Sequence, residues 1–97
     1  PAVERDFAFL VGAEVPVGDL LQAVRSLSGK DSTRSIFSSV NLFDVYSGRG
    51  IASGSKSVAL GVTISPKEET LTEKEIRRIS DSIIAKVEKV TGGKLRK

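Results

Sequence analysis

The stretch FDVYSGRGIASGSKSVALGV, residues 43–62, decides between two kinds of fold, because its glycines fit either a phosphate-binding loop or a hairpin turn. A P-loop needs G-x-x-x-x-G-K-[ST], in which the lysine directly follows the second glycine, but here Ser55 stands between Gly54 and Lys56. A dinucleotide-binding fingerprint fails too, because Ser53 occupies the place of a required glycine. Both kinds of loop also require a helix to follow. The residues after Lys56 alternate like a strand instead, so the stretch predicts a β-hairpin.

Alternating apolar and polar side chains predict three strands, over residues 5–11, 36–46 and 56–64. Successive residues of a strand point to opposite faces of a sheet, so one set of side chains in each strand is expected to face a core. The expected core side chains are Phe7, Phe9, Val11, Phe37, Phe43, Val45, Val58, Leu60, Val62 and Ile64.

Two segments have the spacing of amphipathic helices. The first begins near Pro16, which suits a first helical turn, and Gly29 suits its end. The second begins at Thr72, which can form a capping box with Glu75 three residues later. Glycines at positions 92 and 93 can stop this helix. Its predicted apolar stripe consists of Ile76, Ile79, Ile83, Val87 and Val90.

The end of the chain completes a recognisable order of elements. Residues 94–97 read as a short closing strand, with Leu95 toward the core and Lys94 and Arg96 outward. The order strand, helix, strand, strand, helix, strand is the split β-α-β pattern of ferredoxin-like folds. We therefore predict one α+β domain over residues 1–97, with two helices on one face of an antiparallel sheet. The other face is expected to stay open to solvent or a ligand.

The composition excludes several classes of chemistry. The chain contains neither cysteine nor histidine, which removes thiolate nucleophiles, zinc cages and Ser-His or Cys-His catalytic pairs. We predict no catalytic residue and no metal site, because the D-x-D-x-D-G pattern of a calcium loop is missing as well. The net charge of +3 permits nucleic-acid binding. No apolar run approaches the roughly 18 residues of a membrane helix, and the lack of cysteine fits a cytoplasmic location.

The candidate binding residues stand on either side of the glycine-serine loop. Alternation puts Asp44 and Tyr46 on the open face, and it puts Ser57 and Ala59 beside them on the next strand. Arg96 joins this group if the closing strand forms. Aromatic rings and guanidinium groups stack on splayed RNA bases, and a carboxylate complements the two neighbouring N–H donors of guanine.

The loop itself supplies two further candidates. Arg49 lies within the loop and Lys56 lies at its exit, so both border the open face and could contact RNA phosphates.

Five motifs occur in the order that a known family has. They are RDFAFLV at residues 5–11, LFDVYSGRGI at 42–51, GSKSVALGV at 54–62, TLTEKEI at 70–76 and KLR at 94–96. They are spread in order over essentially the whole chain, from residue 5 to residue 96. Their order resembles the ferredoxin-fold anticodon-binding domain that closes the β subunit of bacterial phenylalanyl-tRNA synthetase. The chain departs from the family at Gly61, where relatives often carry a larger polar or basic residue.

The resemblance implies that the open face binds the anticodon stem-loop of tRNA-Phe, with Asp44 and Tyr46 at the guanine of the first anticodon position. Ser57, Ala59 and Arg96 match the other positions of the family's motifs. It also implies a non-catalytic domain without a cofactor, excised from the C-terminus of a longer chain. That parent would be a phenylalanine–tRNA ligase using ATP and Mg²⁺. Its partners would be tRNA-Phe, the rest of the β subunit and the α subunit.

Other interpretations stay open on the residues alone. An acylphosphatase has this strand-helix order but needs an arginine in the loop after the first strand, where this chain has GAEVPVG and only Asn41 as the required asparagine. An RRM-type binder needs aromatic residues on its third strand, and SVALGV has none. A small-molecule regulatory or dimerisation module of the same fold is a further alternative. So is the C-terminal domain of a single-chain organellar synthetase.

Overall fold

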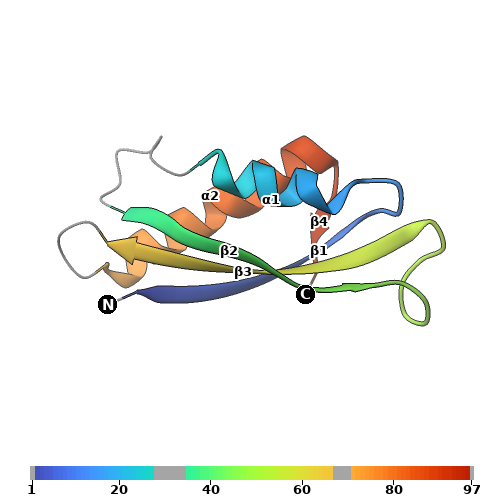
Figure 1. Ribbon diagram of the computed structural model, residues 1–97, viewed down its shortest axis with the longest axis horizontal. Coiled ribbons are helices and arrows are strands. Elements are labelled where there is room, and N and C mark those ends of the chain that lie inside the picture. Colours follow the sequence, from blue (N-terminus) through green and yellow to red (C-terminus); the bar gives the residue numbers. More distant parts are fainter. Residues whose placement is uncertain (1, 28–34, 67–70, 97) are drawn as a thin grey trace.

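The computed structural model describes residues 2–27, 35–66 and 71–96, with only the backbone described at 35–38 and at 66. The elements appear in the predicted order (Figure 1). They are β1 (Val3–Gly12), α1 (Val17–Arg25), β2 (Ser35–Tyr46), β3 (Ser55–Pro66), α2 (Glu73–Thr91) and β4 (Lys94–Leu95). Gly29, the predicted end of the first helix, lies outside the described residues.

The four strands form one antiparallel sheet in the spatial order β2-β3-β1-β4. Both helices lie on the same side of this sheet, as two layers (Figure 1). Among the described elements none lies on the other side, so that face is open, and the predicted α+β ferredoxin-like architecture is confirmed.

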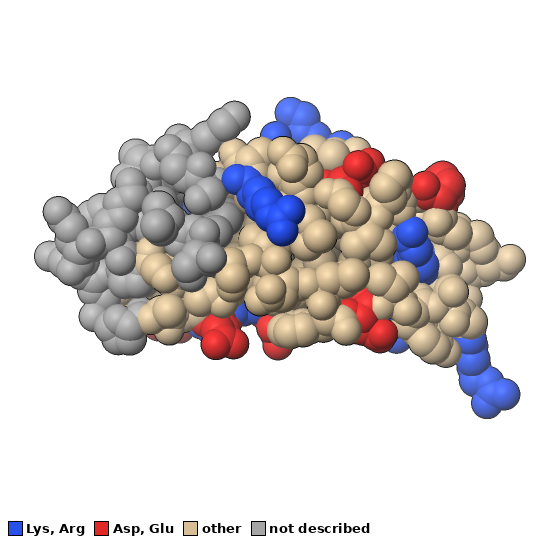
Figure 2. Space-filling view, viewed as in Figure 1, with Lys and Arg blue, Asp and Glu red and all other residues tan. Residues whose placement is uncertain are grey.

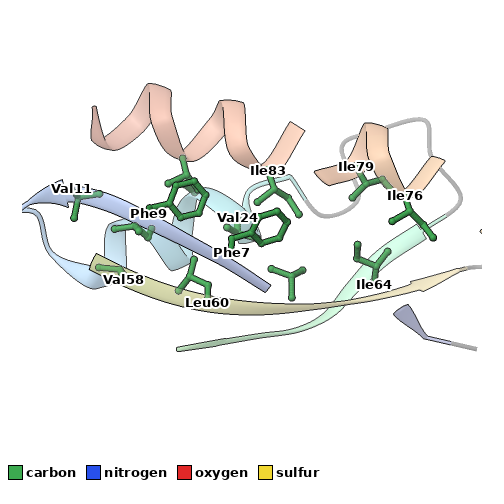
Figure 3. Close-up of a cluster of buried hydrophobic side chains, with 14 of the residues drawn as sticks. Phe7, Phe9, Val11, Val24, Val58, Leu60, Ile64, Ile76, Ile79 and Ile83 are labelled. Atoms are coloured by element: carbon green, nitrogen blue, oxygen red, sulfur yellow. The ribbon is translucent and has the colours of Figure 1, made fainter. Parts of the chain in front are cut away.

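The core lies between the helices and the sheet (Figure 3). Strands β1 and β3 supply its floor, because Phe7 pairs with Leu60 and Phe9 with Val58 in the antiparallel register. Ile83 of α2 is fully buried above them. Of the predicted core residues, these are buried: Phe7, Phe9, Val11, Val58, Leu60, Val62, Ile64, Ile76, Ile79, Ile83 and Val87. The chain therefore has a hydrophobic core of its own.

Helix α2 begins and ends at the predicted residues. Thr72 Oγ1 accepts a hydrogen bond from the Glu75 backbone N–H at 3.1 Å, and the Glu75 carboxylate accepts one from the Thr72 backbone N–H at 3.0 Å. This reciprocal pair is the predicted capping box. At the other end Gly92 has a φ of 74°, the left-handed conformation that stops a helix. The Leu95 N–H then donates to the Glu88 carboxylate at 2.9 Å, which ties α2 to β4.

Two predicted core positions are wrong. Val90 is 50% exposed although it lies on the apolar stripe of α2. Helical periodicity predicts the direction of a side chain but not what lies in that direction, and the last turn of α2 has little of the core beneath it. Phe43 is 59% exposed, because a register shift between Leu42 and Asp44 interrupts the alternation of β2. Such a β-bulge places two residues of one strand opposite a single residue of its partner.

Two other predictions about β2 have different outcomes. The side chain of Phe37 lies outside those that the structure describes. Val45 pairs with the buried Val58, as expected for the core side of the sheet, but it is 44% exposed. The hairpin end of β2 and β3 projects beyond the helices, which leaves this part of the strand without a covering layer (Figure 1).

Thr72→Ala is expected to destabilise the chain by about 1 kcal/mol, because the change removes the hydroxyl that caps α2. Urea unfolding followed by circular dichroism measures the difference. Ser82→Ala is the matched control, since the Ser82 hydroxyl only bonds back to the Arg78 carbonyl within the same helix. Equal stability of the two variants would contradict a role for the capping box.

Gly93→Ala is expected to destabilise the fold by about 1–3 kcal/mol. A Cβ at Gly93 would lie 2.5 Å from Val11 Cγ1 and 2.7 Å from the Leu10 carbonyl oxygen, so β4 would have to move away from β1. Gly18→Ala is the control, because nothing lies within 4 Å of a Cβ there and alanine favours a helix. If thermal unfolding shows that both variants are as stable as the original chain, the close packing of β4 on β1 is not required.

Candidate nucleic-acid interface

The open face carries a shallow floor of small side chains between an acid and a base. Residues that pair across strands share a face, so Ala8 of β1, Ala59 of β3 and Asp44 of β2 form one row across the sheet. At the β1 end of this row the Arg96 backbone N–H donates to the Ala8 carbonyl at 2.7 Å. The row therefore runs from a guanidinium-bearing residue to a carboxylate over two alanines.

Tyr46 lies in the neighbouring row and is held by the hairpin loop. It pairs with Ser57, and its hydroxyl donates a hydrogen bond to the Arg49 carbonyl at 2.8 Å. The residue is 41% exposed. Its ring is therefore fixed before any ligand arrives, which lowers the entropy cost of binding against it.

Arg96 and Ser57 are in contact on this face although they come from strands that are not neighbours in the sheet. Arg96 Nη1 donates to Ser57 Oγ at 3.2 Å. Because Arg96 follows β4 and Ser57 lies on β3, the arginine side chain crosses β1 to make this bond. Ser57 is only 5% exposed. Its hydroxyl therefore orients the guanidinium group and offers little surface of its own.

The β-bulge supplies a residue that the alternation argument missed. Phe43 lies on the open face, where a Cβ at Gly61 would be 2.5 Å from its ring carbon Cζ and 2.6 Å from Cε2. The absence of a side chain at Gly61 thus makes room for this ring. An aromatic ring that covers a strand glycine across the sheet is a known stabilising arrangement. The departure from the family pattern at Gly61 has a local structural reason.

The structure separates the two basic candidates at the loop. Arg49 is exposed within the loop, and its backbone carbonyl accepts the hydrogen bond from the Tyr46 hydroxyl. Lys56 pairs with the buried Val11, so its stem leaves β3 on the side of the helices. Its ammonium group donates to the Ala13 carbonyl at 3.1 Å. An RNA contact of either residue stays a prediction.

Ala8 is a second residue of the site that alternation alone does not identify. It lies two positions from Asp6 in the outward set of β1, but its place beside Ala59 depends on the β1–β3 register. Sequence alternation gives each strand's faces and does not give the pairing of one strand with another. The floor of the site can therefore be identified only once the β1–β3 register is known.

Two further features concern the described residues outside the open face, a pocket and the capacity to hold a metal ion. A pocket of ≈ 260 Å³ lies on the helix side, lined by Arg5, Glu73, Ile76, Arg77 and Ser80. The described residues contain no group of three or more side chains able to hold a metal ion. Figure 2 shows basic and acidic side chains interspersed over the coloured surface in this view.

Neither helix in the described ranges is long and apolar enough to cross a membrane.

These features can bind a planar polar ligand. The open face presents a fixed ring, an acceptor-only carboxylate, a guanidinium group and a flat floor. Such groups recognise nucleobases by stacking and by hydrogen bonds to base edges. No cysteine or histidine is available to activate a nucleophile.

The comparisons with known proteins agree with this geometry. A family model described as "ferredoxin-fold anticodon binding domain" matches residues 1–96. The chain is similar to the phenylalanine–tRNA ligase β subunit of Bradyrhizobium diazoefficiens, with 46% identity over 94 residues. It is also similar to the β subunits of Rhodopseudomonas palustris, with 44% identity over 94 residues, and of Methylococcus capsulatus, with 43% identity over 96 residues.

The matches differ greatly in how much of each protein they cover. They include 97% to 99% of this chain but only 11% or 12% of the relatives' own length. The whole length of the chain thus corresponds to one small part of those subunits. The chain belongs to the ferredoxin-fold anticodon-binding domain family.

Proposed function

We propose that the open face binds the anticodon stem-loop of tRNA-Phe and that Asp44 and Tyr46 read the guanine at the first anticodon position. The observation that carries this proposal is the place of the two residues. Asp44 and Tyr46 lie two residues apart on the same strand, and both belong to the open face. A base stacked on the ring would bring its edge toward the carboxylate.

The choice of guanine rests on hydrogen-bond chemistry. A carboxylate accepts hydrogen bonds, and the two oxygens of Asp44 suit the neighbouring N–H donors on the Watson–Crick edge of guanine. Adenine presents a ring nitrogen acceptor at the corresponding place, which would face the carboxylate with like polarity. The carboxylate therefore favours guanine over adenine.

The opposite side of the site would bind the RNA through Arg96. Its guanidinium group has five N–H donors, and the bond to Ser57 uses one of them. The remaining donors are available for a base edge or a phosphate oxygen. In this proposal Ser57 positions Arg96, and Ala59 with Ala8 lets a base approach the sheet closely. Arg49 would contribute attraction to the phosphates. Lys56 leaves β3 on the helix side and donates to the Ala13 carbonyl, so it takes no part in the proposed contact, contrary to the expectation from the sequence.

The role of the parent protein is part of the same proposal. The relatives of this chain are named as phenylalanine–tRNA ligase β subunits. We propose that the domain serves such a ligase in the cytoplasm, beside the rest of the β subunit and an α subunit. ATP and Mg²⁺ would act in the parent's catalytic region, since nothing in the site above is suited to them.

Asp44→Ala and Tyr46→Ala are each expected to weaken binding of the RNA hairpin by about 1–3 kcal/mol, the effect of losing one edge-read or stacked base. Titration calorimetry with the tRNA-Phe anticodon hairpin measures this. Asp81→Ala on α2 is the matched control for the lost carboxylate. In the full-length synthetase the two variants should raise the KM for tRNA and leave amino-acid activation unchanged.

A base substitution in the RNA tests whether Asp44 contacts the exocyclic amino group of the guanine. Inosine lacks the exocyclic amino group of guanine, so its introduction at the first anticodon position should weaken binding to the original chain. The same substitution should have a much smaller effect on Asp44→Ala, because the acceptor is already missing. Equal losses in both proteins would show that Asp44 does not read this base.

Arg49→Ala is expected to lower the slope of log K against log salt concentration by about 0.7, as one phosphate contact to single-stranded RNA would. The loss of affinity should be similar for hairpins with different loop sequences. Lys89→Ala on α2 is the control and should leave the slope unchanged. An unchanged slope for Arg49→Ala would remove this residue from the interface.

A further inference from the structure

Phe43 is the most exposed large apolar residue of the described chain, and the mechanism proposed above does not use it. An exposed phenylalanine is unusual on a face that is otherwise lined by small and polar side chains. The β-bulge between Leu42 and Asp44 is what turns this side chain to the open face. Bulges often aim a side chain at a site, so the exposure calls for a ligand.

The ring is supported from below as well as exposed. Its tip occupies the space over Gly61, so the sheet limits how far it can collapse onto the backbone. The same point over Gly61 lies 3.3 Å from Asp6 Oδ1, which brings a carboxylate to the edge of the ring. Phe43 and Asp6 therefore offer a ring and a carboxylate on the open face, as Tyr46 and Asp44 do. Asp6 pairs with Gly61, and Asp44 pairs with Ala59, two residues before Gly61 on β3.

We propose that Phe43 is the platform of a second nucleobase subsite on the open face, with the Asp6 carboxylate available to an N–H donor of the bound base. This inference rests on the proposed function, since it assumes that RNA occupies the face. It adds a second base to be read, and it extends the interface from a site for one base to a track along β2.

The spacing along β2 leaves room for two different bases. Phe43 and Tyr46 are three residues apart, which corresponds to about 10 Å along a strand. Stacked aromatic groups have centroids about 4.5–7 Å apart. Rings this far apart leave room for a separate base on each, and a series of abasic hairpins decides whether one base or two occupy them.

The test compares three variants of the 97-residue chain. Phe43→Ala removes the platform, Phe43→Tyr keeps a ring, and Leu42→Ala removes a neighbouring apolar side chain of similar exposure. Leu42 pairs with the buried Leu60, so it belongs to the other face and is the matched control. Affinity for the tRNA-Phe anticodon hairpin is measured by calorimetry, and thermal unfolding of each variant is measured in parallel.

We expect Phe43→Ala to bind the hairpin about 5- to 100-fold more weakly, with Phe43→Tyr and Leu42→Ala close to the original affinity. The salt dependence of binding should not change, because no phosphate contact is lost. A series of hairpins with one abasic nucleotide each then locates the base. The loss caused by Phe43→Ala should vanish at one abasic position, and Tyr46→Ala should lose its effect at a different position.

The outcomes separate the two proposals. If Tyr46→Ala weakens binding while Phe43→Ala changes only thermal stability, Phe43 merely covers Gly61 and the second subsite is wrong. If both variants lose their effect at the same abasic position, one base serves both rings and the second subsite is also wrong. If neither variant changes the affinity, or if the original chain does not bind the hairpin, the proposed function fails together with this inference.

Discussion

The antiparallel ladder between β1 and β3 is the constraint on which the rest of the structure depends. It runs without a register shift from the pair Val3 and Ile64 to the pair Gly12 and Ser55. On one side it lines up the aromatic and branched side chains that the helices cover. On the other side the same register puts Ala8 beside Ala59, which creates the floor of the candidate interface. A slip of one residue would exchange the two faces and remove both.

Strand β2 also pairs in an antiparallel way, but its pairing with β3 is irregular. It lies at the edge of the sheet, and its register with β3 shifts twice. The shift at Phe43 places this ring and Asp44 on one face, whereas strict alternation would have separated them. An edge strand can accept such a bulge because only one neighbour has to accommodate it. The irregular strand thus carries Phe43, Asp44 and Tyr46, and the regular ladder carries the core and the alanine floor of the interface.

The glycine-serine stretch has a modest but definite part in this arrangement. It reverses the chain between β2 and β3, and its Arg49 carbonyl accepts a hydrogen bond from the Tyr46 hydroxyl. Gly54 also accepts a hydrogen bond from the Ala13 N–H at 2.8 Å, which joins the loop to the turn after β1. The loop therefore holds a ring in place and binds no phosphate in the manner of a P-loop, because a strand follows it.

Local signals in the sequence determined a large part of the fold. The capping box at Thr72, the glycine stop at Gly92 and the alternation of β1 and β3 act over a few residues, so they can be read without knowing what lies nearby. The same alternation also identified Asp44, Tyr46, Ser57 and Ala59 as residues of one face. The family resemblance points to the same four residues and to Arg96, and it is carried by the same stretches of sequence.

Only the tertiary structure decided the contacts between distant segments. The reach of Arg96 across β1 to Ser57, the bond of Lys56 to Ala13 and the pairing of Ala8 with Ala59 depend on register. The exposure of Phe43 depends on a bulge, and that of Val90 depends on where the core ends. Periodicity gives the direction of a side chain relative to its own backbone. What that side chain meets is set by segments far away in the chain, whose position no local pattern encodes.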